Sequence, residues 1–134
     1  MTHLELFAGI GGFRRAIDLF CQDNNEESNC VGFSEIDKYA VQSYKAIYQT
    51  EGEIELGDIQ KFVSDERLNE LPEFELLTGG FPCQAFSMMG KKRGFEDERG
   101  EVFYRIIDIL NQSHPNYILL ENCCTKHLAK IFNP

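Results

Sequence analysis

The sequence lacks any apolar run long enough to cross a membrane, since its longest runs are only a few residues. A transmembrane helix needs about 20 consecutive apolar residues, so we expect no membrane span. The first five residues also lack the basic-then-apolar pattern of a signal peptide, which favours the cytoplasm. No repeat, linker or low-complexity tract divides the 134 residues, and we therefore expect one domain over 1–134.

Basic side chains are scarce: 13 Lys and Arg stand against 22 Asp and Glu, which gives a net charge of −9. A protein that grips duplex DNA usually has a basic face, because neutralising phosphates supplies much of the affinity. This chain as a whole should repel DNA, so any DNA contact must be local or made mainly by other protein. The five cysteines have no regular spacing and fit reduced thiols better than a disulfide framework.

Short apolar segments alternate with segments of helical periodicity. The expected strands cover residues 4–7, 30–34, 54–56, 74–78 and 117–120. One helix is expected after Gly12, a second over 37–48 and a third over 102–110. The inward face of the first would consist of Phe13, Ala16, Ile17 and Phe20, and that of the second of Ala40, Val41, Tyr44 and Ile47. This alternation predicts an α/β fold, a parallel sheet with helices on both faces. Ligands of such sheets bind beyond the carboxyl ends of the strands.

A glycine-rich segment, residues 7–12, lies between the first strand and the first helix. Glycine there lets the backbone turn tightly and approach a ligand near the positive end of the helix. Many such turns are only tight connections, and this one does not match Gly-x-Gly-x-x-Gly. We call it the glycine turn.

Two acidic residues follow the next two strands. Glu35 can accept the hydroxyls of a ribose, although a capping role before the helix, together with Asp37, is the simpler explanation. Asp58 can accept from an adenine amino group, or it can be a helix N-cap or turn aspartate. Read singly, neither residue decides between ligand binding and capping.

The segment from Gly79 to Gln84 is more specific. Cys83, in a loop after a buried strand, can be a nucleophile if its surroundings favour the thiolate; the alternative is a buried structural thiol. Glu121 closes the fifth strand at the same edge. A buried carboxyl there could stay protonated and donate to a ring nitrogen, with capping as the alternative.

These residues together resemble the DNA cytosine-5 methyltransferase family. Residues 4–14, 33–37, 57–59, 79–87 and 121–122 resemble successive motifs in the family's order and spacing, and the string Gly-Gly-Phe-Pro-Cys-Gln-Ala-Phe-Ser is highly specific. The resemblance implies a Rossmann-like class I S-adenosylmethionine-dependent methyltransferase fold, here incomplete. It also implies methyl transfer to carbon 5 of a cytosine flipped out of double-stranded DNA, through a covalent cysteine adduct, with S-adenosylhomocysteine as product.

The resemblance also implies roles for single residues. Cys83 would be the nucleophile, and Glu121 the acid that contacts the cytosine. The residues implied for the cofactor are Phe7, Ala8, Gly9, Gly11, Gly12, Glu35, Ile36, Asp58, Ile59, Pro82 and Val102. Residues 90–100 resemble the loop that closes on DNA, and the residues implied for DNA contact are Gln84, Ser87, Lys91, Lys92, Arg93 and Arg99; a solvated charged turn is the alternative for the basic ones.

The chain departs from the family after Asn122, where Cys123 replaces the usual valine and similarity fades. A metal site from Cys123, Cys124 and His127 is disfavoured, because adjacent cysteines are poor tetrahedral partners and a fourth ligand is not evident. We expect no metal.

The family's arginine-bearing motif, target-recognition domain and C-terminal motif have no counterpart in this sequence. We therefore expect a fragment that is inactive alone, from a bacterial or phage restriction-modification setting. The alternative is a non-catalytic remnant, or one half of a split enzyme that needs a complementing C-terminal half or self-associates. A nicotinamide-dependent dehydrogenase shares the glycine turn and Glu35 but leaves Cys83 unexplained.

Overall fold

The strands form one parallel sheet. The computed structural model describes residues 1–80 and 98–121. Within them the strands are β1 (Thr2–Leu6), β2 (Asn29–Phe33), β3 (Ile54–Glu55), β4 (Leu76–Gly80) and β5 (Tyr117–Glu121). Their order across the sheet is β3-β2-β1-β4-β5, and each neighbouring pair is parallel.

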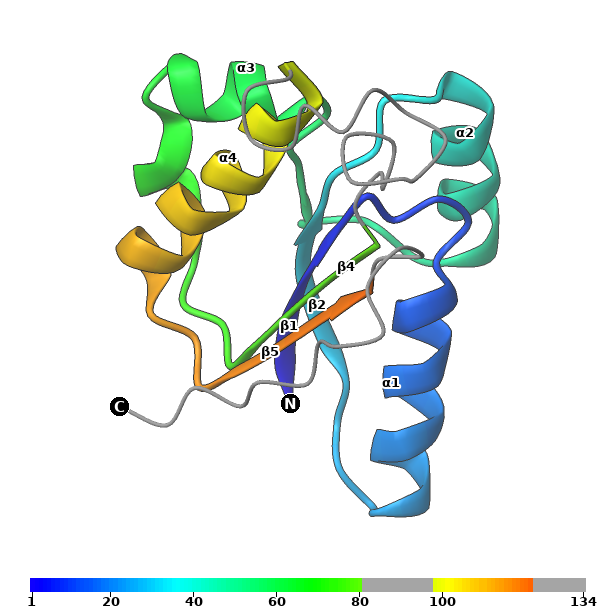
Figure 1. Ribbon diagram of the computed structural model, residues 1–134. Coiled ribbons are helices and arrows are strands. Elements are labelled where there is room, and N and C mark those ends of the chain that lie inside the picture. The colour runs from blue at the N-terminus through cyan, green and yellow to red at the C-terminus, as the bar shows by residue number, and fades with distance from the viewer. Residues whose placement is uncertain (81–97, 122–134) are drawn as a thin grey trace.

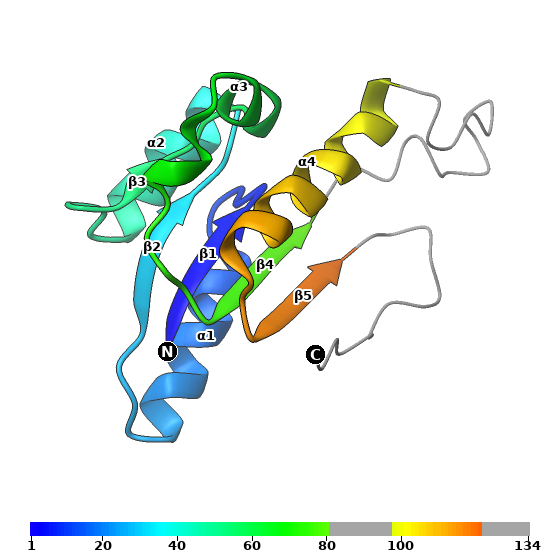
Figure 2. The ribbon, with the colours of Figure 1, turned by 90° about the vertical axis from the view of Figure 1, so that its left-hand side faces the viewer.

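Helices cover both faces of this sheet. They are α1 (Gly12–Asp23), α2 (Lys38–Ile47), α3 (Ile59–Ser64), the 3-10 helix η1 (Arg67–Glu70) and α4 (Glu98–Ser113). Helices α1 and α2 lie on one face, and α3 and α4 lie on the other (Figures 1 and 2). The expected α/β architecture is thus confirmed. The sequence pattern does not predict α3 and η1, since six and four residues are too few to show a helical period.

The alternation of β1 divides its side chains between two environments. Leu4 and Leu6 pack with Leu77, Ile106 and Ile109 in the main core, on the side of α3 and α4. The intervening His3 and Glu5 face α1, together with Thr78 of β4, and all three are fully buried. The sheet therefore has one apolar face and one face with buried polar groups.

The expected inward faces of α1 and α2 were partly wrong. In α1 the structure buries Ile17 and Cys21, whereas Ala16 is exposed and Phe20 is 53% exposed. In α2 only Tyr44 is buried, and Ile47 is 58% exposed. Residues four apart lie almost directly above one another on a helix, so a narrow contact with the sheet buries one such row and leaves the adjacent row in solvent.

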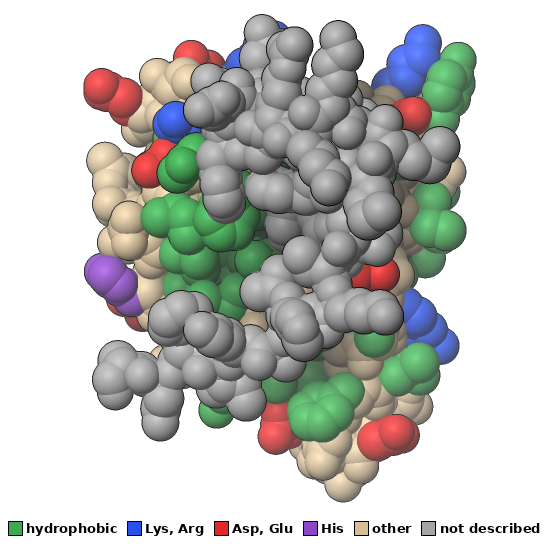
Figure 3. All heavy atoms as spheres, viewed as in Figure 1, with side chains coloured by type: hydrophobic (Ala, Val, Ile, Leu, Met, Phe, Trp, Pro, Cys, Tyr) green, Lys and Arg blue, Asp and Glu red, His purple; other side chains and the backbone are tan. Residues whose placement is uncertain are grey.

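Edge strand β5 carries exposed apolar side chains on the same face as α1. Tyr117 is 57% and Leu119 is 48% exposed, while Ile118 and Leu120 pack against the main core on the other face. Apolar side chains also gather over the region of α4 on the face seen in Figure 3. Self-association through such a surface stays a prediction. Among the described residues, each helix is too short or too polar to cross a membrane.

Candidate functional site

The candidate site lies where the strand order reverses. From β1 the chain goes to β2 and β3 on one side, and the segment after β3 crosses to β4 on the other side of β1. The carboxyl ends of β1 and β4 therefore meet at a switch point, where loops diverge and leave a crevice for ligands in folds of this kind. Four of the expected features lie at or just after strand ends at this edge of the sheet: the glycine turn, Glu35, Asp58 and Glu121.

The glycine turn has an unusual backbone. Phe7, Gly9 and Gly11 all have positive φ angles of 55°, 55° and 88°. The amide of Ala8 donates to the carbonyl of Ser34 over 2.8 Å, and the amide of Gly11 donates to the carbonyl of Ala8 over 2.8 Å. A positive φ is costly for Phe7, so the surrounding contacts hold the turn in a conformation that the chain would not choose locally.

Glu35 ties the glycine turn to the loop after β2. Its Oε2 accepts the amide of Gly9 over 2.8 Å, and its Oε1 accepts the amides of Ile36 over 2.8 Å and Asp37 over 2.9 Å. The carboxylate thus fixes the relative position of the two loops. Any ligand that Glu35 binds would meet a group already held in place.

Two expected capping roles are confirmed. Asp37 caps α2 by accepting the amides of Tyr39 and Ala40, and Asp58 caps α3 by accepting the amide of Gln60 over 2.9 Å. A cap uses only part of a carboxylate's capacity and does not prevent ligand binding.

The two isoleucines expected to contact the cofactor differ in exposure. Ile36 is 77% exposed, whereas Ile59 is 2% exposed and belongs to the main core. Ile36 offers its side chain to a ligand, but Ile59 would do so only through its backbone. Val102, also expected in the pocket, is half-buried and packs against the main core.

Glu121 lies at the end of β5 beside Gly80 of β4. A Cβ at Gly80 would lie 3.7 Å from Oε2 of Glu121 and 3.9 Å from the ring of Phe13, so the ends of β4 and β5 and the start of α1 converge. The expectation of a buried carboxyl was wrong, because Glu121 is exposed in the described structure. Because β5 is an edge strand of the described sheet, the described residues shield only one side of Glu121, and its role as the acid stays a prediction.

Several expected site residues lie outside the described residues: Pro82, Cys83, Gln84, Ser87, Lys91, Lys92, Arg93, Cys123, Cys124 and His127. Arg99 lies in α4, but its side chain is outside the described part. The roles of these residues stay predictions. Within residues 1–80 and 98–121, His, Cys, Asp and Glu side chains do not group into a possible metal site.

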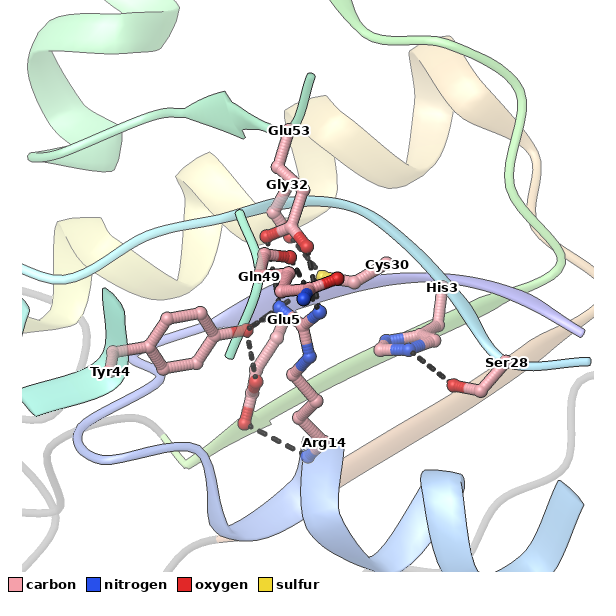
Figure 4. A network of polar contacts seen from close by, with 9 residues as sticks. All are labelled: His3, Glu5, Arg14, Ser28, Cys30, Gly32, Tyr44, Gln49 and Glu53. Carbon is pink, nitrogen blue, oxygen red and sulfur yellow. Dashed lines mark hydrogen bonds and ion pairs between the residues drawn. The ribbon is translucent and has the colours of Figure 1, made fainter. Parts of the chain in front are cut away.

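A buried polar network that the sequence did not predict lies beneath the glycine turn (Figure 4). Glu5 accepts the hydroxyl of Tyr44 over 3.1 Å and the amide of Arg14 over 3.3 Å. The Arg14 guanidinium donates to both carboxylate oxygens of Glu53, over 3.0 and 2.8 Å, and to the Tyr44 hydroxyl over 3.2 Å. The network joins β1, α1, α2 and the segment before β3.

Burial sets the protonation of this network. Desolvation raises the pKa of Glu5 to about 7, although the bonds from Tyr44 and Arg14 oppose that shift. Desolvation also raises the pKa of Tyr44 and raises that of the Cys30 thiol to about 11. For Arg14, desolvation opposes the charge, but the bonds to Glu53 and Tyr44 outweigh it and raise the pKa. Arg14 is therefore the fixed positive charge of the network.

One feature of the sequence, the position of Glu5, indicates that such a network is needed. An acidic residue between Leu4 and Leu6, in a strand expected to be buried, needs a partner, because an unpaired buried carboxylate is costly. The sequence does not name that partner, since Tyr44 and Glu53 are 39 and 48 positions away from Glu5 along the chain.

Comparisons with known proteins agree with this geometry. A family model described as C-5 cytosine-specific DNA methylase matches residues 1–128. The chain is 45% identical over 119 residues to the orphan methyltransferase M.Rho11sI of Bacillus phage rho11s, and 46% identical over 120 residues to the type II methyltransferase M.NlaX of Neisseria lactamica. Each match covers 89% of this chain but only 22% and 35% of the relative, so the chain spans about a fifth to a third of their length.

The fold of this chain is also similar to that of a solved methyltransferase. The crystal structure of S. pombe Dnmt2 methyltransferase superposes with a TM-score of 0.60 at 25% identity, over 91% of this chain and 33% of that one. The arrangement of β1 to β5 described above is therefore shared with a solved methyltransferase over nearly the whole chain.

Proposed function

Because this chain belongs to the C-5 cytosine-specific DNA methylase family, we propose that it acts in the transfer of a methyl group from S-adenosylmethionine to carbon 5 of cytosine in DNA. The observation that carries the proposal is the convergence of the glycine turn, Glu35, Asp58 and Glu121 at one edge of the sheet. In this proposal the chain contributes the cofactor-binding turn and the two catalytic side chains.

The residues present fit the proposed cofactor. The glycine turn, with Phe7, Ala8, Gly9, Gly11 and Gly12, would approach the methionine portion, since it leads directly into the N-terminus of α1 and its glycines have no side chains to keep a ligand away. Ile36, mostly exposed beside Glu35, would pack on the adenine, and Asp58 would accept its amino group with the Ile59 backbone nearby. Pro82 and Val102 would complete the pocket.

Glu35 would bind the ribose, and its present contacts limit how it does so. A carboxylate has about four acceptor positions, and three are occupied by the amides of Gly9, Ile36 and Asp37. One ribose hydroxyl can be accepted without change. Accepting both hydroxyls requires Glu35 to share or release one of its hydrogen bonds from a backbone amide. Ribose binding would then be coupled to the glycine turn.

The chain's own groups would activate the cytosine. Carbon 5 of cytosine is a weak nucleophile, so direct methylation is slow. The Cys83 thiolate adds to carbon 6 while Glu121 donates a hydrogen bond to ring nitrogen 3, and the electron pair of the carbon 5–carbon 6 bond becomes available at carbon 5. When bound, the cofactor supplies an electrophilic methyl group. Loss of the carbon 5 proton and departure of the Cys83 thiolate then restore the ring.

Double-stranded DNA is the proposed partner, with the target base flipped out of the duplex. Gln84, Ser87, Lys91, Lys92, Arg93 and Arg99 would contact it locally. The net charge of −9 makes the chain a poor DNA binder as a whole, so the remaining phosphate contacts would come from other protein. Restriction-modification in the cytoplasm is the proposed setting.

Methyl transfer to DNA tests the function directly. We would replace the matching 120 residues of M.NlaX by this chain and measure tritium transfer from labelled S-adenosylmethionine to duplex DNA. The chimera should transfer label, Cys83→Ser should abolish transfer, and Cys21→Ala should retain it. The 134-residue chain alone should show no turnover, since it spans only 35% of that relative. A folded chimera without activity would favour the non-catalytic remnant instead.

A further inference from the structure

Tyr48 contacts the glycine turn from the end of α2. Its hydroxyl donates to the carbonyl of Gly11 over 2.7 Å. A Cβ at Gly11 would lie 2.3 Å from Cε2 of the Tyr48 ring, so the ring occupies the space that a side chain at position 11 would need. Gly11 therefore lacks a side chain for two reasons: its φ of 88° and the presence of Tyr48.

Tyr48 is itself held by the buried network. The Arg14 guanidinium lies 4.5 Å from the centroid of the Tyr48 ring, on its face, and the Tyr44 ring lies 4.9 Å away. Arg14 is fixed by its two bonds to Glu53, and both side chains are about nine-tenths buried (Figure 4). Contacts thus form a closed path from Gly11 along α1 to Arg14, then to Tyr48 and back to Gly11.

We infer that Tyr48 is a positioning residue for the cofactor site: its hydroxyl and the Arg14 guanidinium that packs on its ring fix the Gly11–Gly12 peptide of the glycine turn. The inference rests on the proposed function, because it gives Tyr48 a role in binding S-adenosylmethionine without contact to it. Tyr48 lies outside the segments that resemble the family's motifs, which are residues 4–14, 33–37, 57–59, 79–87 and 121–122.

The physical basis is the peptide plane between Gly11 and Gly12. The Gly11 carbonyl accepts both the Arg15 amide, over 3.0 Å, and the Tyr48 hydroxyl. In a trans peptide the N–H points opposite to the carbonyl, so fixing this carbonyl also fixes the Gly12 N–H, which then points away from Tyr48. Two glycines in sequence would otherwise lose much conformational freedom on binding, and a turn ordered in advance avoids that cost.

Binding of S-adenosylhomocysteine by the full chain tests the role, measured by calorimetry. Tyr48→Phe keeps the ring and removes the hydroxyl, and should weaken binding roughly two- to tenfold, the net effect of one neutral hydrogen bond. Tyr39→Phe removes a hydroxyl from an exposed position of the same helix and should bind like wild type. Ile109→Val, in α4 on the opposite face, should lower stability without weakening binding. Equal affinity of Tyr48→Phe and wild type would overturn the inference.

A second measurement separates this inference from the cofactor proposal, because it needs no ligand. The carbonyl carbon of Gly11 and the amide of Gly12 are followed by NMR in isotope-labelled chain. Tyr48→Phe should shift both resonances and speed exchange of the Arg15 amide, whereas Tyr39→Phe should leave them unchanged. If wild type does not bind S-adenosylhomocysteine, the cofactor proposal fails, and these shifts alone decide whether Tyr48 holds the turn. Unchanged resonances in Tyr48→Phe would refute that role as well.

Discussion

Glu5 and Tyr44 meet in a fully buried space beneath the glycine turn, where the Tyr44 hydroxyl donates to Oε2 of Glu5 over 3.1 Å. The carboxyl is ionised less readily there than in water, and its pKa is raised to about 7 from 4.5. Between these two values the folded protein holds a proton that the unfolded chain has lost. The contribution of Glu5 to stability is therefore full below pH 4.5 and decreases as the pH rises to 7.

The Glu5→Gln variant should lose this dependence. Its free energy of unfolding, relative to wild type, should rise between pH 4.5 and 7, by up to about 3 kcal/mol for a shift of this size. Urea denaturation at several pH values measures the difference. The contribution of His3 to the free energy of unfolding changes with pH in the opposite direction, and it does so in both proteins. Burial lowers the pKa of His3 to about 4, so this contribution decreases as the pH falls below 6.5. A difference that does not change with pH would mean that Glu5 ionises normally.

The Arg14–Glu53 pair should show strong coupling. Removing one partner by Arg14→Met or Glu53→Gln leaves a mostly buried group without its counter-charge, and each should cost about 3 kcal/mol of stability. The double variant should cost less than the sum of the two single variants, by roughly 0.5–3 kcal/mol. Urea denaturation of all four proteins gives the coupling free energy. Strict additivity would show that the pair contributes little and that the network is held by other contacts.

Gly32 should not tolerate a side chain. A Cβ there would lie 2.6 Å from the carbonyl oxygen of Ile54 in the neighbouring strand β3, and backbone cannot move aside easily. Gly32→Ala should therefore cost about 1–3 kcal/mol, the usual penalty of overpacking. Gly12→Ala is the matched control, because a Cβ there would meet open space. Similar stability of the two variants would mean that β3 is displaced at little cost.

The described cysteines should be unreactive in the native protein. Cys21 and Cys30 are buried, and burial raises the pKa of the Cys30 thiol to about 11, so little thiolate forms at neutral pH. Brief alkylation followed by peptide mass spectrometry should leave both unmodified, while Cys83, as the proposed nucleophile, is modified. Rapid modification of Cys30 would contradict the burial of the network. Protection of Cys83 would support the alternative of a structural thiol.

The sequence predicted the sheet because its strands are short, apolar and separated by clear turn signals. It also predicted which segments meet at the carboxyl edge, since in a parallel sheet every strand ends there. Asp37 was recognisable as a cap because it precedes an expected helix, whereas Asp58 was offered as a cap or turn residue only because it follows an expected strand. These features depend on residues close together in the chain.

The contacts that the sequence did not predict join distant residues. Arg14 and Glu53 are 39 positions apart, and Tyr48 and Gly11 are 37 apart, so neither pair leaves a local pattern. The sequence allowed a buried carboxyl at Glu121, but Glu121 is exposed at the end of β5, an edge strand in the described structure. Strand order, which decides such burial, is a property of the whole fold.

In the proposed function, S-adenosylmethionine binds at the carboxyl ends of β1, β2 and β3. NMR titration of the labelled chain with S-adenosylhomocysteine tests it most directly. Amide resonances of the glycine turn, of Glu35 to Asp37, and of Asp58 and Ile59 should shift together and saturate, and Glu35→Ala should weaken the binding about tenfold or more, since a bond to a charged group is lost. Shifts confined to other segments, or none at millimolar ligand, would contradict the account.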